Sequence, residues 1–489
     1  MNLSGWKANF VLCILCAATT IAAHAQTLTT LASFNGTDGS QPSVPLIQGL
    51  DGNLYGETFG GGIVSQLCSS TLSGAGCGTF FKITAAGALT TLYAFCSQAN
   101  CADGFNPDGL ALGTDGNFYG TTASGGSNRD GTVFRITAAG ALTTLHSFKG
   151  TDGSAPTGTL VQGTDGNFYG ATASGGTSSW GTVFKIATAG TLTTLHDFSL
   201  TGGGSPSGGL VQGSDGNFYG TTYYGGTGSA CGPNACGTVF KMTPAGALTT
   251  LHSFDSTDGQ SPVGKLVQGT DGNFYGTTGQ GGLGDCNGLA GCGTVFKITS
   301  AGALTTLHSF DSADGGEPSG LTQATDGNFY GATEIGGSGN ACGGNCGTAF
   351  KMTSAGTLTT LHDFDLTDGA GPASAPFEAT SGTLYGTTQS GGSACGPAGC
   401  GTVFSLALGL GPFVETLPAS GKTGTSVIIL GNNLTGAASV TFNGTAATFS
   451  VVSSTEIKTT VPSGATTGKV KVKTPSRTLA SNLNFRVIP

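Results

Sequence analysis

The chain has 489 residues, and glycine makes up about 18% of them, far above the ~7% of an average protein. Charged residues are only 9% and apolar residues reach 37%, a balance that excludes a disordered, highly charged chain. The formal net charge is −9, and residues 26–411 alone carry nine basic and 24 acidic side chains, which argues against nucleic acid as a partner, because phosphate binding needs a basic surface. We therefore expect a folded, turn-rich β protein.

The first 25 residues have the pattern of a secretory signal peptide. Lys7 precedes the apolar run FVLCILCAATTIAA, and Ala23-His24-Ala25 supplies small residues before a cleavage site at Gln26. The run is too short for a comfortable membrane span. We expect an exported protein, extracellular or at the cell surface or in the periplasm, with no transmembrane segment in the mature chain.

A nine-residue motif, TDGNFYGTT at 114–122, recurs along the chain with variations. Its aligned positions are Asp51, Asp115, Asp165, Asp215, Asp271, Asp326 and Ser381, which lie 50 to 64 residues apart. Periods near 50 residues are typical of propeller blades. Asp-Gly between two β-prone runs predicts a hairpin turn, so we interpret these aspartates as turn formers and not as metal ligands.

Each period contains four strand-like runs, seen for example at 159–163, 167–172, 181–187 and 191–198. Four antiparallel strands in each of seven copies predict an all-β fold, a seven-bladed β-propeller over residues 26–411. The mature chain opens with a lone fourth run at 27–34 and ends its last copy on a third run at 401–407. These two ends complete one blade, whereas the alternative, an open solenoid, would need caps.

Residues 412–489 differ from the repeats in charge and pattern. They carry seven basic and two acidic residues, against nine and 24 in the rest of the mature chain. Short alternating runs such as SVIIL, SVTFN and KVKVKT are separated by Gly, Pro and Asn turns. They predict a small immunoglobulin-like β-sandwich that begins near Pro412.

Twelve cysteines follow the signal peptide, mostly in the longer loops between second and third strands. They form six neighbouring pairs: Cys68 and Cys77, Cys96 and Cys101, Cys231 and Cys236, Cys286 and Cys292, Cys342 and Cys346, Cys395 and Cys400. In an exported protein such pairs favour disulfides over the alternative, a zinc site. The connectivity among the first four cysteines stays open at this point.

Two family resemblances rest on these motifs. The tail, with Gly431-Asn432-Asn433-Leu434 and Val461-Pro462 among its motifs, resembles the IPT/TIG immunoglobulin-like family, whose domains serve as spacers or interaction modules. The repeats, DGNFYGTT…GG…GTVFKIT…LTTLHSF, resemble the GloVer tandem-repeat family of secreted or surface-anchored bacterial proteins. That second resemblance implies no established activity.

Candidate functional residues must depart from the repeat, because positions that pack the scaffold are copied into every blade. The loops between strands two and three, and those between strands four and one, emerge on one face of a propeller. The tentative binding residues in or beside them are Phe59, Trp180, Tyr223, Tyr224 and Glu334. Aromatic rings of this kind stack on sugars or on apolar groups of a protein. An aspartate that recurs before the first strand is interpreted as another turn former, with a weak Ca²⁺ or sugar site as the alternative.

The sequence shows no catalytic constellation, metal site or cofactor motif. We expect a non-catalytic binding or cell-surface interaction protein whose partner is an extracellular polysaccharide or a surface protein. One alternative is a secreted polysaccharide lyase or hydrolase that uses the carboxylates outside the repeat, Glu57, Glu317, Glu334 and Glu378. Another is a structural envelope protein without a discrete ligand.

Overall fold

The structure is a computed structural model that describes residues 27–68, 76–228, 230–284, 286, 291–338, 342–343 and 345–488. The predicted signal peptide lies outside these residues. The described part is built of β-strands, with two short 3-10 helices, η1 (Ala99–Cys101) and η2 (Gly232–Asn234), and no α-helix within it. The expected all-β fold class is therefore confirmed.

Seven four-stranded antiparallel units follow one another along the chain and form the blades of the propeller. A parallel bridge between Thr159 and Gly209 joins the third and fourth units into one eight-stranded sheet. Blade 1 contains β2 (Ile47–Gln48), β3 (Leu54–Thr58), β4 (Thr79–Ile83) and β5 (Leu89–Ala94). Blade 2 contains β6 (Phe105–Leu112), β7 (Phe118–Ser124), β8 (Thr132–Ile136) and β9 (Leu142–Ser147). Blade 3 contains β10 (Ser154–Gln162), β11 (Phe168–Ser174), β12 (Thr182–Ile186) and β13 (Leu192–Asp197). Blade 4 contains β14 (Gly204–Gln212), β15 (Phe218–Tyr224), β16 (Thr238–Met242) and β17 (Leu248–Ser253). Blade 5 contains β18 (Gln260–Gln268), β19 (Phe274–Gln280), β20 (Thr294–Ile298) and β21 (Leu304–Ser309). Blade 6 contains β22 (Gly316–Gln323), β23 (Phe329–Ile335), β24 (Thr348–Met352) and β25 (Leu358–Asp363). Blade 7 combines β26 (Phe377–Glu378), β27 (Leu384–Thr388) and β28 (Thr402–Ala407) with β1 (Thr27–Ser33).

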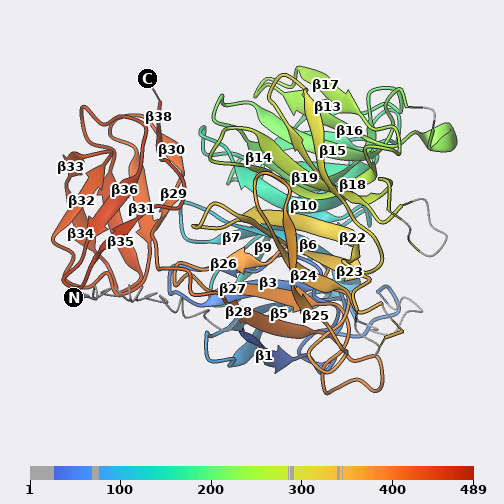
Figure 1. Cartoon of the computed structure of the whole chain (residues 1–489), viewed down its shortest axis with the longest axis horizontal. Coiled ribbons are helices and arrows are strands. Elements are labelled where there is room, and N and C mark those ends of the chain that lie inside the picture. Colours follow the sequence, from blue (N-terminus) through green and yellow to red (C-terminus); the bar gives the residue numbers. More distant parts are fainter. Residues whose placement is uncertain are drawn as a thin grey trace, which may run out of the picture.

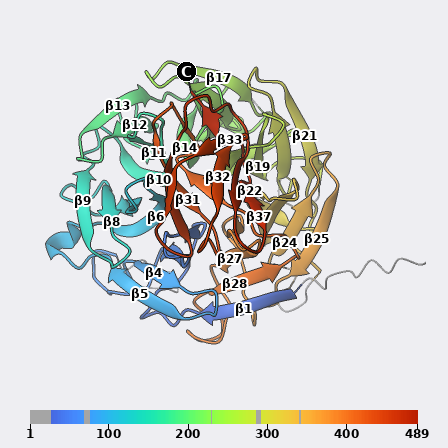
Figure 2. The same ribbon diagram turned by 90° about the vertical axis from the view of Figure 1, so that its left-hand side faces the viewer.

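The blades are arranged in a ring, with the first strand of each blade nearest the axis (Figure 2). Closure joins the two ends of the repeat region, because β1 pairs antiparallel with β28 from Thr27 opposite Ala407 to Ser33 opposite Thr402. This is the pairing that the complementary runs at 27–34 and 401–407 predict.

The repeated letters Phe-Tyr-Gly pack neighbouring blades against each other. Phe168 and Tyr169 point to opposite sides of β11, and Phe168 stacks on Tyr119 of blade 2 with ring centroids 4.0 Å apart. Tyr169 stacks in turn on Phe218 of blade 4 at 4.1 Å. Gly170 follows because a Cβ there would lie 2.6 Å from Phe184 Cζ. The same contact between a tyrosine and a phenylalanine joins each pair of neighbouring blades from blade 1 to blade 6.

The aspartate of the motif has the turn-forming role that the sequence indicates. Asp115 Oδ1 accepts a hydrogen bond from the Asn117 backbone N–H at 3.1 Å, and Oδ2 accepts from the Tyr119 hydroxyl at 2.9 Å. Gly116 between them has a φ of +81°, which glycine tolerates without strain. The same bonds recur in blades 1 and 3 to 6.

The innermost strands of blades 2 to 6 are longer than the strand-like runs in the sequence, whereas those of blades 1 and 7 are only two residues long. In blade 3 the strand begins at Ser154 and not at residue 159, and its register against β11 shifts between Thr157 and Val161. Gly158 at this bulge has a φ of +70°, and a Cβ on it would lie 2.3 Å from the backbone nitrogen of Gly209 in blade 4. The prediction failed because bulge residues with positive φ do not look like strand residues.

The tail forms the expected small sandwich. One sheet contains β29 (Glu415–Leu417), β31 (Ser426–Leu430), β35 (Glu456–Thr460) and β34 (Phe449–Val451); the other contains β33 (Thr445–Ala447), β32 (Ser439–Phe442), β36 (Val470–Lys473) and β37 (Thr478–Ala480). A short parallel pair, β30 (Ser420–Gly421) and β38 (Arg486–Val487), completes it. Val427, Ile429, Val440, Phe442 and Val472 belong to its buried core.

The sandwich lies against one end of the ring and covers its centre (Figures 1 and 2). It contacts the Asp-Gly turns, which we call the turn face. Thr455 donates to the Leu50 carbonyl at 2.7 Å, Asn432 donates to the Thr380 hydroxyl at 2.7 Å, and the Arg486 guanidinium contacts the Ser214 carbonyl. Ile428 and Leu430 add apolar contacts to the first two blades.

Candidate binding face and central cavity

The loops that join second to third strands share one face with the loops that join successive blades, as expected. Gly176, in the loop after β11, donates its N–H to the Gly150 carbonyl in the loop before β10 at 2.8 Å. The same bond joins Gly282 to Ser256 in blade 5 at 2.7 Å. We call this the loop face. Since the sandwich contacts the turn face, the loop face is the end of the ring that the sandwich leaves uncovered.

The ring of aspartates on the loop face is held in turns by hydrogen bonds. Asp152 accepts from the Lys149 backbone N–H at 3.0 Å and pairs with His146 Nε2 at 3.0 Å. The equivalent His–Asp pairs are His252 with Asp258, His308 with Asp314 and His362 with Asp368. Blade 4 has Gly202 at the aspartate position, and there burial lowers the pKa of His196. These bonds occupy the carboxylates, which favours the turn interpretation over a Ca²⁺ or sugar site.

The structure joins the twelve cysteines in neighbouring pairs. The disulfides are Cys68–Cys77, Cys96–Cys101, Cys231–Cys236, Cys286–Cys292, Cys342–Cys346 and Cys395–Cys400. The sulfur atoms of Cys68, Cys77 and Cys96 lie within 4.8 Å of one another, a spacing that could hold a metal. Because all three are half-cystines, they offer no thiolate ligand to zinc.

Three of the five predicted binding residues lie together. Trp180 precedes β12 in blade 3, and its ring is 6.4 Å from that of Tyr224 at the end of β15 in blade 4. Tyr223 lies beside Tyr224, with ring centroids 4.8 Å apart. Trp180 also packs on the backbone of Gly204, where a Cβ would lie 2.7 Å from its Cε3. The cluster of Trp180, Tyr223 and Tyr224 is half-buried and crosses the junction between the two blades.

Phe59 and Glu334 lie apart from this cluster, in blades 1 and 6. Phe59 is 39% exposed, and its carbonyl accepts a hydrogen bond from the Asn106 side chain at 2.8 Å. Glu334 lies in β23, facing Glu317 of β22 and lining the central cavity. Burial first, and the nearby Glu317 carboxylate second, raise the pKa of Glu334 to about 7.

The other carboxylates outside the repeat serve the scaffold. Glu378 accepts hydrogen bonds from the Thr325 backbone N–H at 2.9 Å and from its hydroxyl at 2.7 Å. Glu57 accepts from the Gly109 N–H at 3.2 Å, while its Oε1 is buried without a partner. Burial, followed by the proximity of Asp108, raises the pKa of Glu57 well above its usual value.

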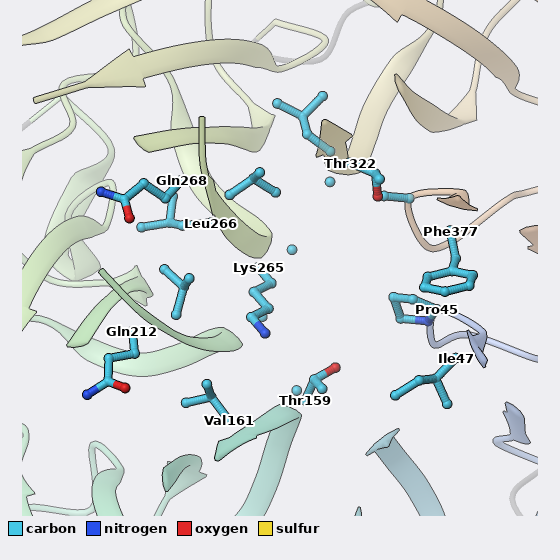
Figure 3. A pocket seen from close by; sticks show the side chains of 18 of the residues that line it. Pro45, Ile47, Thr159, Val161, Gln212, Lys265, Leu266, Gln268, Thr322 and Phe377 are labelled. Carbon is cyan, nitrogen blue, oxygen red and sulfur yellow. The ribbon is translucent and has the colours of Figure 1, made fainter. Parts of the chain in front are cut away.

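A cavity of about 1120 Å³ lies along the axis of the ring. Its wall comes from the inner strands, with apolar residues such as Val161, Leu266 and Phe377, and from sandwich residues that include Glu415 and Arg486. Figure 3 shows Lys265 reaching from its strand into the open centre of this space. Lys265 is not among the residues predicted from the sequence, although the sequence contains a signal for it. Blade 5 has three residues between Pro262 and Leu266, where blades 2 and 6 have two.

No helix in the described part of the chain is long and apolar enough to cross a membrane.

These features define a seven-bladed propeller with an immunoglobulin-like sandwich over one end. The repeats match the family model described as the Gloeobacter/Verrucomicrobia repeat over residues 60–288 and 285–448, and the chain belongs to that family. Residues 413–487 match the IPT/TIG domain model. Both resemblances in the sequence are thereby confirmed. A search of curated proteins found no match.

Solved structures resemble this chain at low identity and low TM-score. One is the extracellular domain of a protein described as a hybrid two-component system from B. thetaiotaomicron, 11% identical, with a TM-score of 0.48. That match covers 95% of this chain, which spans 58% of the length of the other. A protein described as a 6-phosphogluconolactonase from Bacteroides uniformis is 18% identical over 66% of this chain and 87% of its own, with a TM-score of 0.43. A gluconolactonase from Xanthomonas campestris is 15% identical over 63% of this chain and 87% of its own, with a TM-score of 0.39. Because these values are low, none assigns an activity to this chain.

Proposed function

We propose that the protein is an exported, non-catalytic binding or cell-surface interaction protein that recognises an extracellular polysaccharide or a surface protein on its loop face. The observation that carries the proposal is the position of the sandwich on the turn face, opposite the loops that vary between blades. The loop face can then meet a partner while the sandwich serves as spacer or attachment. The disulfides in the enlarged loops hold them in place before binding, which lowers the entropy cost of association.

The cluster of Trp180, Tyr223 and Tyr224 supports a sugar or an apolar protein group as the ligand. Aromatic rings bury a large area at a small cost in side-chain entropy. Tyr223 is the residue of choice for a test of recognition, because Trp180 also packs on the backbone of Gly204.

A glycan array probed with the full mature chain tests the proposal. We expect binding to a restricted set of polysaccharides, with those polysaccharides recovered at their original length. The proposal would be refuted if the chain bound no glycan on the array and also bound no protein in a screen of bacterial surface proteins. That result would favour a structural envelope protein.

A polysaccharide lyase or hydrolase is the second candidate, and one observation favours it. Glu334 and Glu317 face each other beside the cavity, and the raised pKa of Glu334, about 7, suits a general acid at neutral pH. Incubation of polysaccharides with the native chain and with Glu334→Gln tests this candidate. Polysaccharides that are shortened by the native chain but not by the variant would establish cleavage in place of simple binding.

A further inference from the structure

Lys265 occupies a position that breaks the repeat inside the ring. Blades 3, 4 and 5 each carry one more inner-strand residue than blades 2 and 6, and the additional residues are Thr159, Gly209 and Lys265. All three belong to bulged strands next to the axis. Two of them, Thr159 and Lys265, place side chains along the cavity wall, with Thr159 on the side toward which Lys265 points (Figure 3).

The amine of Lys265 has no hydrogen-bond or ion-pair partner among the residues that the structure describes. The other ionisable side chains that line the cavity are Asp108, Glu334, Glu415 and Arg486, and none forms an ion pair with it. An unpaired lysine inside a protein is unusual, because a buried charge needs a partner. Its place inside a cavity of about 1120 Å³ therefore calls for a ligand.

The surroundings favour a reactive amine over a fixed positive charge. An anion site would offer further free donors, yet the nearby amides are engaged and the Arg486 guanidinium contacts the Ser214 carbonyl. Gln212 donates to the Gly216 carbonyl at 3.0 Å, and Gln268 donates to the Gly272 carbonyl at 3.0 Å. Lys265 keeps an intermediate exposure because it borders the cavity, while the inner strands of the ring surround it. This burial lowers the pKa of Lys265 to about 8, so an appreciable fraction of the amine is unprotonated and nucleophilic near neutral pH.

We propose that the central cavity binds a small molecule with an electrophilic carbonyl group, an aldehyde or a 2-oxo acid, and that Lys265 captures it as an imine. The lone pair of Lys265 Nζ attacks the carbonyl carbon, and the π electrons move to the oxygen. The nitrogen loses its two protons, the oxygen leaves as water, and a C=N bond replaces C=O. No oxidant or reductant is consumed, and hydrolysis reverses the step. The apolar wall around Val161 and Leu266 would hold the body of the ligand. The proposal is independent of recognition on the loop face.

The test uses glyoxylate as the probe and cyanoborohydride to trap the imine, followed by peptide mapping of the full mature chain by mass spectrometry. At about pH 7.5 we expect Lys265 to become carboxymethylated at least about tenfold faster than exposed lysines, because its unprotonated fraction is larger. Lys458, whose side chain is 58% exposed, is the internal reference. The rate at Lys265 should level off above about pH 8, while the rate at Lys458 continues to rise.

Lys265→Arg is the matched variant, since it keeps a cation and removes the nucleophile. It should abolish modification at this position and leave the rate at Lys458 unchanged, with native circular dichroism as the folding control. Two results would overturn the proposal: equal rates at all lysines, or an unmodified Lys265 in a chain whose Lys458 has reacted. Both are read from the native chain, so the conclusion does not depend on how the variant folds.

Discussion

Glu415 shows at the level of a single residue how the contact between sandwich and ring changes side-chain chemistry. It lies in β29 and lines the central cavity. Burial, with the nearby Glu378 carboxylate as the second cause, raises the pKa of Glu415 from 4.5 to about 7. In the sequence, Glu415 is one of the two acidic residues of a basic tail. Its burial could not be predicted, because it depends on how the sandwich and the ring meet.

We expect Glu415→Gln to stabilise the protein at neutral pH but not at acidic pH. Between the ordinary glutamate pKa and about 7 the native state holds a proton that the unfolded state has released, so the free energy of unfolding falls as the pH rises through this window. Denaturant unfolding of both proteins should give a difference near zero at about pH 4 that grows until about pH 7 and then stays constant. A difference that does not change with pH would show that Glu415 is not buried in this way.

At the level of secondary-structure elements, the second, third and fourth strands of a blade could be predicted from sequence. The inner strand could be predicted only in its second half, since the expected run 159–163 covers only the end of β10 (Ser154–Gln162). The Phe-Tyr-Gly and Thr-Val-Phe runs repeat because each contacts the same neighbours in every blade, as Phe168 and Tyr119 illustrate. The inner strands instead meet at the axis, where the ring accepts residues as different as Gly209 and Lys265. The repeat therefore carries no information about the cavity, and only the change in strand length pointed to it.

Gly158→Ala should destabilise the protein more than Gly166→Ala. Both glycines have positive φ, +70° and +81°, so the backbone strain of an alanine is similar at the two positions. They differ in space, because a Cβ at Gly158 would lie 2.3 Å from the Gly209 nitrogen, whereas nothing lies within 4 Å at Gly166. Overpacking should add about 1–3 kcal/mol to the cost at Gly158. Equal losses in denaturant unfolding would mean that the inner strands do not touch there.

At the scale of the whole molecule, the repeat region forms a ring that closes between its own two ends, β1 and β28, and has two distinct faces. Closure could be predicted, because the lone runs at 27–34 and 401–407 complement each other. The choice of face for the sandwich could not, because the motifs that hold the contacting residues, such as Asn432 in the tail and Thr380 in the repeat, do not show which end of the ring the sandwich meets. The position of the candidate binding face opposite the sandwich is therefore information that only the structure supplies.

Removal of Thr27–Ser33 should destabilise the entire ring. β28 would lose its partner along the register from Ser33 to Thr27, and each lost backbone hydrogen bond contributes about 1 kcal/mol net. We expect a loss of a few kcal/mol and a broader unfolding transition, measured by differential scanning calorimetry. An unchanged transition would show that blade 7 closes without β1.

The most direct test of whether the loop face recognises the partner compares three proteins on the glycan array. They are the native chain, the variant Tyr223→Ala and the variant Lys471→Ala. Lys471 is an exposed residue of the sandwich and serves as the control for the opposite end of the molecule. We expect Tyr223→Ala to bind at least about tenfold more weakly at an unchanged melting temperature, and Lys471→Ala to bind like the native chain. Native affinity of Tyr223→Ala together with weakened binding of Lys471→Ala would place recognition on the sandwich and contradict the proposed function of the loop face.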